Sequence, residues 1–353
     1  MKVALTDLDL PMTFSSLVVE TNSRCNAKCA MCYQSAGPKG SDLIGDHRLG
    51  TDDVKDLLRS AVDIKEIGRR FHTSGGAAFL RPDDLFAVFE YAKGLEHFQD
   101  ISTTTNAYWA ATKRKAMRIA QQAAQSGVTM MEISWDHWHG PYVSAHAVSN
   151  CIDACVEHGI EPHLRLLTTK SHTAAEALSR LRPESVERAS NIHSCPVFST
   201  GRAAREIDAD EFHHGCADEM AIAGACHSAL NLTVNARGDV YPCCAGADQT
   251  QGLAFGNIHD QPLREIVDEM QASPMLRVLV FSGVAAFYPI LQQAEIQIRP
   301  RYHNMCEFCT DIFSRPDAAA AIKRHFDDAT ACAIAAALRH WADTDFEKTL
   351  QIA

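Results

Sequence analysis

The sequence lacks the features that mark a secreted, membrane-spanning or nucleic-acid-binding protein. Its first residues, MKVALTDLDLPMTF, carry aspartates where a signal peptide needs an uninterrupted apolar core. No apolar run of about 18 residues, the length that a membrane-spanning helix needs, occurs in the 353 residues. Lys and Arg number 33 against 44 Asp and Glu, and no basic block is long enough to follow a phosphate backbone. We therefore expect a cytoplasmic protein without nucleic-acid or membrane partners.

The sequence is instead rich in clustered cysteines, with 13 in the chain. In a reducing cytoplasm, cysteines spaced two or three residues apart are more often metal ligands or catalytic groups than disulfide partners. Three of them, Cys25, Cys29 and Cys32, form C-x3-C-x2-C early in the chain. Three thiolates from one loop suit an iron-sulfur centre whose fourth position stays open for chemistry. A zinc knuckle completed by a distant histidine is the alternative.

Apolar runs and helical periods alternate through the first two hundred residues. The pattern predicts strands at 17–20, 71–74, 100–105, 128–134, 162–168 and 191–197, and helices at 51–70, 82–93, 111–126, 144–158 and 174–181. Such units argue for parallel strands joined by right-handed crossovers. The expected fold class is α/β, an incomplete (β/α)6 TIM-like barrel followed by a smaller α+β module. We expect a lead at 1–14, the barrel at 15–205, the module at 206–315 and C-terminal helices at 316–353.

The cysteine loop, with Met31 before its third cysteine and Tyr33 after it, resembles the signature of the radical S-adenosylmethionine (SAM) superfamily. The family commonly has an aromatic residue at the position of Met31. The resemblance implies that the three cysteines bind a 4Fe-4S cluster, whose open iron takes the amino and carboxylate groups of SAM. It also implies that an electron from the cluster cleaves SAM to methionine and a 5′-deoxyadenosyl radical, which abstracts a hydrogen atom from the substrate. A flavodoxin- or ferredoxin-type protein would donate that electron.

Motifs that follow the other predicted strands resemble SAM-binding positions of the superfamily. Ser74-Gly75-Gly76 stands where the family has a Gly-Gly-Glu turn that receives the amino group of SAM, but Ala77 replaces the glutamate. A backbone carbonyl, Thr73 or Ser74 would then take its role. Glycine would allow SAM to approach the backbone closely. The resemblance implies SAM contacts from Met31, Tyr33, Gly75, Gly76, Asn106, Ser134, Asp136 and Arg165, the last of these as a clamp for the carboxylate.

The second module carries four more cysteines at spacings typical of a metal site. They are Cys226, Cys243, Cys306 and Cys309. A predicted hairpin over residues 231–241 brings the first two together. This half resembles the SPASM and shorter twitch extensions of radical SAM enzymes, which implies an auxiliary 4Fe-4S cluster. The next cysteine, Cys332, follows after 22 intervening residues, which favours a single auxiliary cluster. Cys244 is an alternative ligand to Cys243, because neighbouring strand residues point to opposite sides.

Three further side chains are candidates for catalysis. Cys195 lies near the end of the last predicted strand, and His137 and His139 follow the fourth strand, over the expected barrel mouth. A buried structural thiol is the alternative for the cysteine, and a packed loop is the alternative for the histidines.

The predicted chemistry fits two classes of substrate. By resemblance to the peptide maturases, the enzyme would cross-link, oxidise or epimerise a ribosomally made peptide. By resemblance to the twitch dehydrogenases, it would oxidise a secondary alcohol of an aminocyclitol or sugar. We favour the peptide. About 16 residues precede the first strand, so a separate protein would have to recognise a leader if one is needed. A non-catalytic iron-sulfur or zinc scaffold is the alternative from another class.

Overall fold

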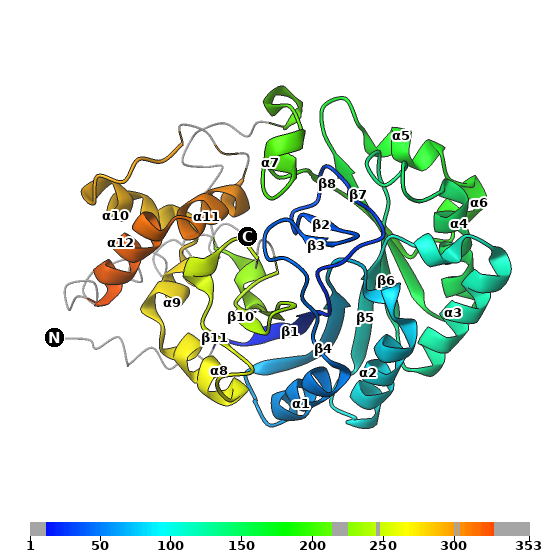
Figure 1. Cartoon of the computed structure of the whole chain (residues 1–353), viewed down its shortest axis with the longest axis horizontal. Helices are drawn as coiled ribbons and strands as arrows, with labels where there is room; N and C mark the ends of the chain where they lie inside the picture. Colours follow the sequence, from blue (N-terminus) through cyan, green and yellow to red (C-terminus); the bar gives the residue numbers. More distant parts are fainter. Residues whose placement is uncertain (1–11, 214–224, 245–247, 300–301, 303, 328–353) are drawn as a thin grey trace, which may run out of the picture.

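The computed structural model describes residues 12–213, 225–244, 248–299, 302 and 304–327, and its centre is a nine-stranded sheet (Figure 1). The strand order is β11-β10-β9-β1-β4-β5-β6-β7-β8. Neighbouring strands from β9 through β1 to β8 are parallel, so helices or long loops must connect them. The barrel strands are β1 (Phe14–Glu20), β4 (Ile67–Ser74), β5 (Asp100–Thr105), β6 (Met130–Ser134), β7 (Glu161–Thr168) and β8 (Asn191–Pro196). They confirm the predicted incomplete (β/α)6 barrel.

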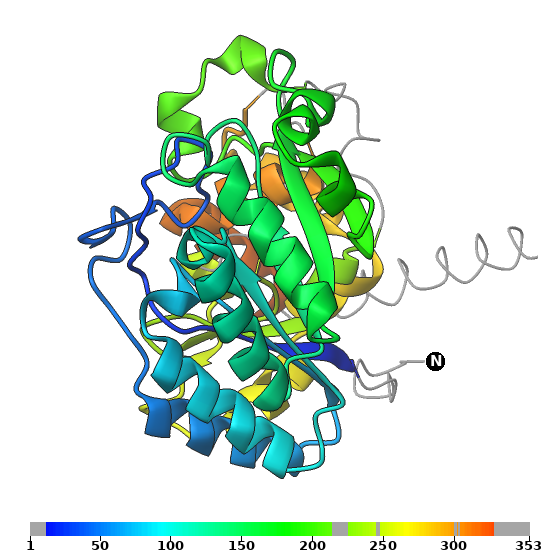
Figure 2. The ribbon, with the colours of Figure 1, turned by 90° about the vertical axis from the view of Figure 1, so that its right-hand side faces the viewer.

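Helices cover the outer face of these strands (Figures 1 and 2). They are α1 (Thr51–Val62), α2 (Pro82–Gly94), α3 (Lys113–Gln125), α4 (Ala145–Glu157), α5 (Ala174–Ser179) and α6 (Pro183–Val186). In α1, Val54, Leu57, Leu58 and Ala61 repeat at helical spacing and are buried. Because the helices close the outside, the loops after the strands are left to form a site at the carboxyl ends of the barrel.

The first helix is shorter than the sequence predicts. We expected a helix over 51–70, but α1 ends at Val62 and β4 begins at Ile67. Apolar residues at positions 64, 67 and 71 fit a helical period, which explains the error. Gly68 shows why the segment is a strand. A Cβ at Gly68 would lie 2.8 Å from the Ser15 carbonyl oxygen, so glycine allows β4 to approach the neighbouring strand.

The second module extends the sheet beyond β1. Strand β9 (Asn231–Val234) is parallel to β1, and β10 (Asp239–Tyr241) is antiparallel both to β9 and to β11 (Gly256–Asn257). This arrangement confirms the predicted hairpin, and Gly238 adopts a left-handed φ of 89° in its turn. The helices of the module are α8 (Leu263–Ala272), α9 (Pro274–Phe281), α10 (Tyr288–Gln293) and α11 (Met305–Ser314).

Three short elements and one longer helix complete the α-helices and strands of the described residues. Strands β2 (Ala36–Gly37) and β3 (Gly40–Ser41) pair within the loop that follows the first cysteines, and α7 (Ala203–Glu206) follows β8. Helix α12 (Pro316–Asp327) begins where C-terminal helices were predicted. Cys332 and the rest of that predicted segment lie outside the described residues. Over the described ranges, no helix combines the length and the apolar character needed to cross a membrane.

Candidate active site

The three-cysteine loop follows the carboxyl end of β1. Cys25 and Cys29 are buried, Cys32 is half-buried, and all three line one cavity of about 210 Å³. We call the three cysteines the loop site and this hollow the three-cysteine cavity. The Cys25 N–H donates to the Gly37 carbonyl at 3.0 Å, and the Cys32 N–H donates to the Cys29 carbonyl at 3.1 Å. The loop therefore presents three sulfur donors to a single hollow at the strand ends, where the active sites of barrels lie.

A buried arginine that sequence reasoning missed, Arg202, holds this loop. Its side chain has no exposed surface, and its guanidinium donates to the carbonyls of Cys29 at 2.9 Å, Ser35 at 2.5 Å and Ala36 at 2.9 Å. It also pairs with Asp42 at 3.1 Å. The guanidinium has several donors in a rigid planar fork, so this one side chain can donate hydrogen bonds to three carbonyls at once. These contacts tie the carbonyl of Cys29 to those of the segment that follows the cysteines.

The same guanidinium favours the form of the thiols that binds metal. Burial raises the pKa of Cys25 to about 11, and it also raises the pKa values of Cys29 and Cys32 above the ordinary thiol value. The charge of Arg202 acts in the opposite direction on all three. Because the thiolate is the metal ligand, the buried cation offsets part of the cost of burying these groups in their ligating form.

Gly75 and Gly76 line the cavity, but the close contact that requires glycine is with the chain itself. A Cβ at Gly76 would lie 2.0 Å from the Arg24 carbonyl oxygen. A Cβ at Gly75 would lie 2.6 Å from the Asn22 carbonyl oxygen, and Gly75 has a left-handed φ of 120°. The sequence analysis attributed this close approach to SAM. The structure shows that it belongs to the backbone leading into the cysteine loop.

Seven of the eight predicted SAM contacts line the three-cysteine cavity. They are Met31, Tyr33, Gly75, Gly76, Asn106, Ser134 and Arg165. Asp136 is the exception, because its Oδ1 accepts the N–H groups of Trp138 at 3.0 Å and His139 at 3.1 Å. Its Oδ2 is buried without a hydrogen-bond partner. The Asp136 carboxylate therefore shapes the turn after β6 instead of lining the cavity.

Three kinds of group were expected to replace the missing glutamate at Ala77: a backbone carbonyl, Thr73 and Ser74. Thr73 is fully buried, and its hydroxyl donates to the Thr103 hydroxyl at 2.9 Å. The Ala77 carbonyl accepts from Asn22 Nδ2 at 3.2 Å. Ser74 lines the cavity and is the candidate for this role.

The three candidate catalytic residues lie in different surroundings. His139 lines the cavity, with its Nδ1 2.9 Å from Asp136 Oδ1. His137 is outside the cavity, where its ring stacks on that of His172 with 3.5 Å between centroids. Cys195 is half-buried on β8 and also outside the cavity. Only His139 is placed to meet a molecule bound beside the cysteines.

Charged and polar side chains on the barrel strands complete the wall of the cavity. Arg165 Nη1 lies 3.5 Å from Glu132 Oε2. The Thr104 hydroxyl donates to the same carboxylate oxygen at 3.2 Å, and it lies 2.9 Å from His72 Nε2. A guanidinium in this position can hold a bound carboxylate through two parallel hydrogen bonds. The wall therefore has the chemistry to bind an amino acid or a SAM carboxylate.

The four cysteines of the second module converge, although they come from separate segments. Cys306 and Cys309 lie one turn apart at the start of α11. The pKa of Cys309 is raised well above its ordinary value, first by burial and then by the neighbouring Cys243, Cys226 and Cys306. Cys309 is thus close to the other three. We call these four cysteines the module site, and four thiolates are the usual ligand set of a closed iron-sulfur cluster.

Cys244 lines the three-cysteine cavity, although it follows Cys243 directly in the chain. Burial raises the pKa of its thiol to about 11, with Glu20 raising it further and Arg165 lowering it. The sequence analysis treated Cys244 only as an alternative ligand. The opposite orientation of neighbouring residues in an extended chain was the signal that could have placed it here.

Gln249 connects the module to the cysteine loop. Its Oε1 accepts the Gly201 N–H at 2.7 Å, and its Nε2 donates to the Tyr33 carbonyl at 3.0 Å. The Tyr33 hydroxyl in turn donates to Glu20 at 3.4 Å, where burial raises the pKa of the Glu20 carboxyl. The loop site and the module therefore belong to one hydrogen-bonded assembly.

The residues of the cavity fit a cluster with an open coordination position and SAM beside it. Three sulfur donors come from one loop, which leaves the fourth position of a tetrahedral iron without a protein ligand among them. Hydroxyl, amide and guanidinium groups on four different strand ends face the same space. These are the groups that bind the amino, carboxylate and ribose parts of a cofactor.

Comparison with known proteins supports this description. Residues 226–310 match the SPASM family, described as an iron-sulfur cluster-binding domain. The chain is 23% identical over 303 residues to the putative peptide biosynthesis protein YydG of Bacillus subtilis, covering 84% of this chain and 91% of that protein. It is 29% identical over 126 residues to the GTP 3′,8-cyclase of Listeria welshimeri, which covers 34% of this chain and only 33% of the cyclase.

A solved structure shows the same fold. The enzyme anSMEcpe with bound AdoMet and a peptide aligns with a TM-score of 0.53 and 11% identity, covering 93% of this chain and 99% of that one. Residues 226–310 are thus similar to an iron-sulfur cluster-binding SPASM domain, and the whole chain shares its fold with an AdoMet-binding enzyme. Together with the three-cysteine loop, these findings support a radical SAM enzyme with a SPASM/twitch-type domain, whose cofactors would be a SAM-binding 4Fe-4S cluster, SAM and an auxiliary 4Fe-4S cluster.

Proposed function

We propose that this enzyme modifies a ribosomally made peptide by epimerising one or more of its residues. The observation that carries the proposal is the Cys244 thiol, which lines the same cavity as Cys25, Cys29 and Cys32. A thiol beside the place where a hydrogen atom is removed can return a hydrogen atom to the substrate. Of the modifications considered for a peptide, epimerisation is the one that needs such a return.

The loop site would hold the catalytic cluster, with SAM bound by the cavity residues around it. When bound, the cluster and SAM supply the one-electron cleavage of SAM and the removal of a hydrogen atom from the substrate. Arg202 keeps the loop in its binding conformation, and Ser74, Ser134 and Arg165 would orient SAM through hydrogen bonds. Cys226, Cys243, Cys306 and Cys309 would hold the auxiliary cluster.

Cys244 would complete the exchange at the substrate carbon. The carbon loses one hydrogen atom, and the Cys244 S–H bond breaks to supply another from a different direction, which inverts the centre. The sulfur then takes up one electron and one proton to restore the thiol. The electron comes from the same low-potential donor that reduces the catalytic cluster, a flavodoxin- or ferredoxin-type protein. Two electrons are thus consumed in each turnover.

The relative from Bacillus subtilis supports a peptide as the substrate, because its name describes it as a peptide biosynthesis protein and the match spans 91% of its length. A separate protein that recognises a leader segment would be a further partner. The competing proposal, oxidation of a secondary alcohol in an aminocyclitol or sugar, has no comparable use for a second thiol in the cavity.

The test is the mass of the product formed in deuterated water. The anaerobic, cluster-loaded enzyme would be incubated with SAM, dithionite and peptides encoded by short reading frames beside its gene. The Cys244 S–H exchanges with solvent, so each epimerised residue gains about one mass unit in D2O and none in H2O. Cross-linking or oxidation instead removes about two mass units, and that result would contradict the proposal.

Cys244→Ala and Cys195→Ala form a matched pair for the role of the thiol. The first variant should still cleave SAM but should make no D-residue, because the hydrogen donor is gone. The second should match the wild type, because Cys195 lies outside the cavity. Full epimerisation by Cys244→Ala would refute the assignment.

A further inference from the structure

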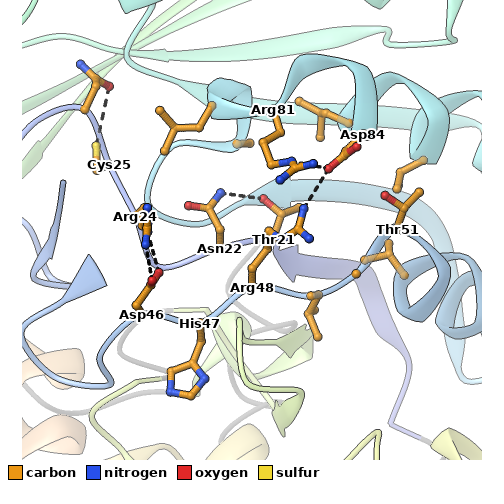
Figure 3. Close-up of a pocket in the computed structure, with 18 of the residues that line it drawn as sticks. Thr21, Asn22, Arg24, Cys25, Asp46, His47, Arg48, Thr51, Arg81 and Asp84 are labelled. Carbon is orange, nitrogen blue, oxygen red and sulfur yellow. Dashed lines mark hydrogen bonds and ion pairs between the residues drawn. The ribbon is translucent and has the colours of Figure 1, made fainter. Parts of the chain in front are cut away.

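A second and larger hollow lies beside the segment that leads into the cysteine loop, and Cys25 is part of its lining (Figure 3). It has a volume of about 680 Å³ and lies between the segment 21–26, the start of α1 and the start of α2. Its lining includes Arg24, Arg48 and Arg81, and we call it the arginine cleft. No part of the proposed peptide chemistry uses it.

One layer of backbone separates the arginine cleft from the three-cysteine cavity. The Gly76 N–H donates to the Asn22 carbonyl at 2.7 Å, and the Ala77 N–H donates to the Arg24 carbonyl at 2.7 Å. Cys25, one of the proposed cluster ligands, lines both hollows. The arginine cleft is therefore an approach from outside to a cluster ligand that does not pass through the space for SAM and substrate.

The charges of the cleft differ in sign from those of the whole chain. The protein has a net charge of −11, whereas the lining of the cleft has three arginines and two aspartates. Arg24 forms an ion pair with Asp46. Arg48 and Arg81 both face one carboxylate, that of Asp84, at 2.9 and 2.6 Å, as Figure 3 shows.

These two arginines leave a positive charge without a partner among the lining residues. Their side chains are well exposed, at 45% for Arg48 and 62% for Arg81. An acidic protein is repelled by most of this chain and is attracted where the local charge is reversed. Guanidinium groups also stack on the faces of aromatic rings, so this pair of arginines can pack against a flat ring system.

We propose that the arginine cleft is the docking site of an acidic, flavin-bearing electron carrier of the flavodoxin type. The edge of the flavin would enter the cleft between Arg48 and Arg81, and one electron would pass from the reduced flavin to the cluster through Cys25. The flavin is oxidised by one electron and the cluster is reduced by one. This proposal rests on the proposed function, because it requires the catalytic cluster at Cys25, Cys29 and Cys32.

The test measures how fast the cluster is reduced, not how fast the enzyme turns over. The cluster-loaded protein would be mixed anaerobically with reduced flavodoxin, or with dithionite, and the loss of cluster absorbance followed by stopped flow. The Arg48→Glu/Arg81→Glu variant should be reduced by flavodoxin at least about tenfold more slowly, since opposite charges no longer steer the encounter. The wild-type rate with flavodoxin should fall as salt is added, and dithionite should reduce both proteins alike.

A matched control is the Arg59→Glu/Arg70→Glu variant, which reverses two exposed arginines that do not line the cleft. It should keep the wild-type rate with flavodoxin. The milder Arg48→Gln/Arg81→Gln variant should be reduced by flavodoxin at a rate between those of the Arg48→Glu/Arg81→Glu variant and the control. An intermediate rate guards against a folding defect in the charge-reversal variant. Equal rates for the cleft variant and the control would overturn the proposal.

Two other outcomes also decide the question. A ferredoxin that reduces the wild type faster than flavodoxin does would overturn the choice of a flavin carrier. A protein that dithionite cannot reduce at all would contradict the proposed function instead, so the two failures can be told apart.

Discussion

The loop site and the module site use the same ligand atom but are built in opposite ways. The loop site draws three cysteines from eight consecutive positions, 25 to 32, which follow a single strand. The module site draws four cysteines from segments up to 83 positions apart, as the numbers 226 and 309 show. The local site has one ligand fewer and opens onto a cavity, whereas the dispersed site has a full set.

If both sites hold clusters as proposed, this difference is how one fold would separate a reactive metal centre from an unreactive one. A short loop can supply only a few ligands that converge from one side, so an open position follows from its construction. That loop in turn needs support from elsewhere, and Arg202 provides it through three carbonyls. Segments that are distant in sequence can surround a cluster completely, but they depend on the hairpin and on α11 being folded.

The largest effect on this comparison should come from removing the support of the loop site. Arg202→Met deletes the buried guanidinium and, with it, its hydrogen bonds to the carbonyls of Cys29, Ser35 and Ala36. We expect a loss of about 4 kcal/mol in the free energy of unfolding, as for breaking a buried charged network. Iron content should fall by about four atoms per chain, because one 4Fe-4S cluster is lost.

Arg202→Lys is the matched control for that variant. Lysine keeps the positive charge but lacks the planar fork of the guanidinium. Relative to Arg202→Met, Arg202→Lys should therefore recover part of the lost stability and a smaller fraction of the lost iron. Urea unfolding and iron assay of both variants measure these effects. Unchanged iron in Arg202→Met would show that the loop holds its cluster without the arginine.

The next effect distinguishes two adjacent cysteines. Cys243→Ala should lower the iron content toward about four atoms per chain, because the module site loses a ligand, whereas Cys244→Ala should keep about eight. The physical reason is that, after burial, Cys243 is the first charge that raises the pKa of Cys309, whereas Cys244 lines the three-cysteine cavity. After burial and Cys226, Cys244 also raises the pKa of Cys306, which makes the comparison of the two variants a direct test. Iron assay and Mössbauer spectroscopy of the two variants provide the measurement. The reverse result would make Cys244 the ligand of the auxiliary cluster.

The smallest effect concerns a buried carboxyl in the module, Asp248. Burial is the main cause that raises its pKa from 3.8 to about 6, while a hydrogen bond from Asn235 lowers it. Between these values the folded protein keeps a proton that the unfolded chain releases, so stability falls as the pH rises from about 4 to about 6 and stays lower above it. Asp248→Asn cannot ionise and should be more stable than the wild type at pH 7, by about 3 kcal/mol.

Thermal unfolding of the Asp248→Asn variant and the wild type at several pH values between 4 and 7 tests this prediction. The two stability curves should converge near pH 4 and separate by pH 6. A constant difference across the whole range would mean that Asp248 ionises in the folded protein as it does in the unfolded chain.

The sequence allowed the loop site to be predicted because all of its information is local. C-x3-C-x2-C is readable without any tertiary structure, and the alternation of strands and helices predicted the barrel. Arg202 could not be found in this way, because the chain segments that it joins are about 170 residues apart. Helix α1 was predicted too long, because residues 64, 67 and 71 satisfy a helical period although β4 begins at Ile67.

Other site residues show the same limit. Asp136 follows a barrel strand, which made it a candidate SAM contact, yet its carboxylate is used by the turn that follows. Cys244 was noticed only as a neighbour of Cys243, since the direction in which each thiol points depends on how β10 packs on the barrel. Residue type and spacing predict the local chemistry, whereas the direction of a side chain requires the folded structure.

The most direct test of the central claim, that the loop site is the centre that cleaves SAM, is the yield of 5′-deoxyadenosine. The wild type and a Cys25→Ala, Cys29→Ala, Cys32→Ala variant would be loaded with iron and sulfide anaerobically, reduced with dithionite and given SAM. The wild type should release 5′-deoxyadenosine, and the variant should release none while keeping about four irons in the module site. Formation of 5′-deoxyadenosine by the variant would contradict the account.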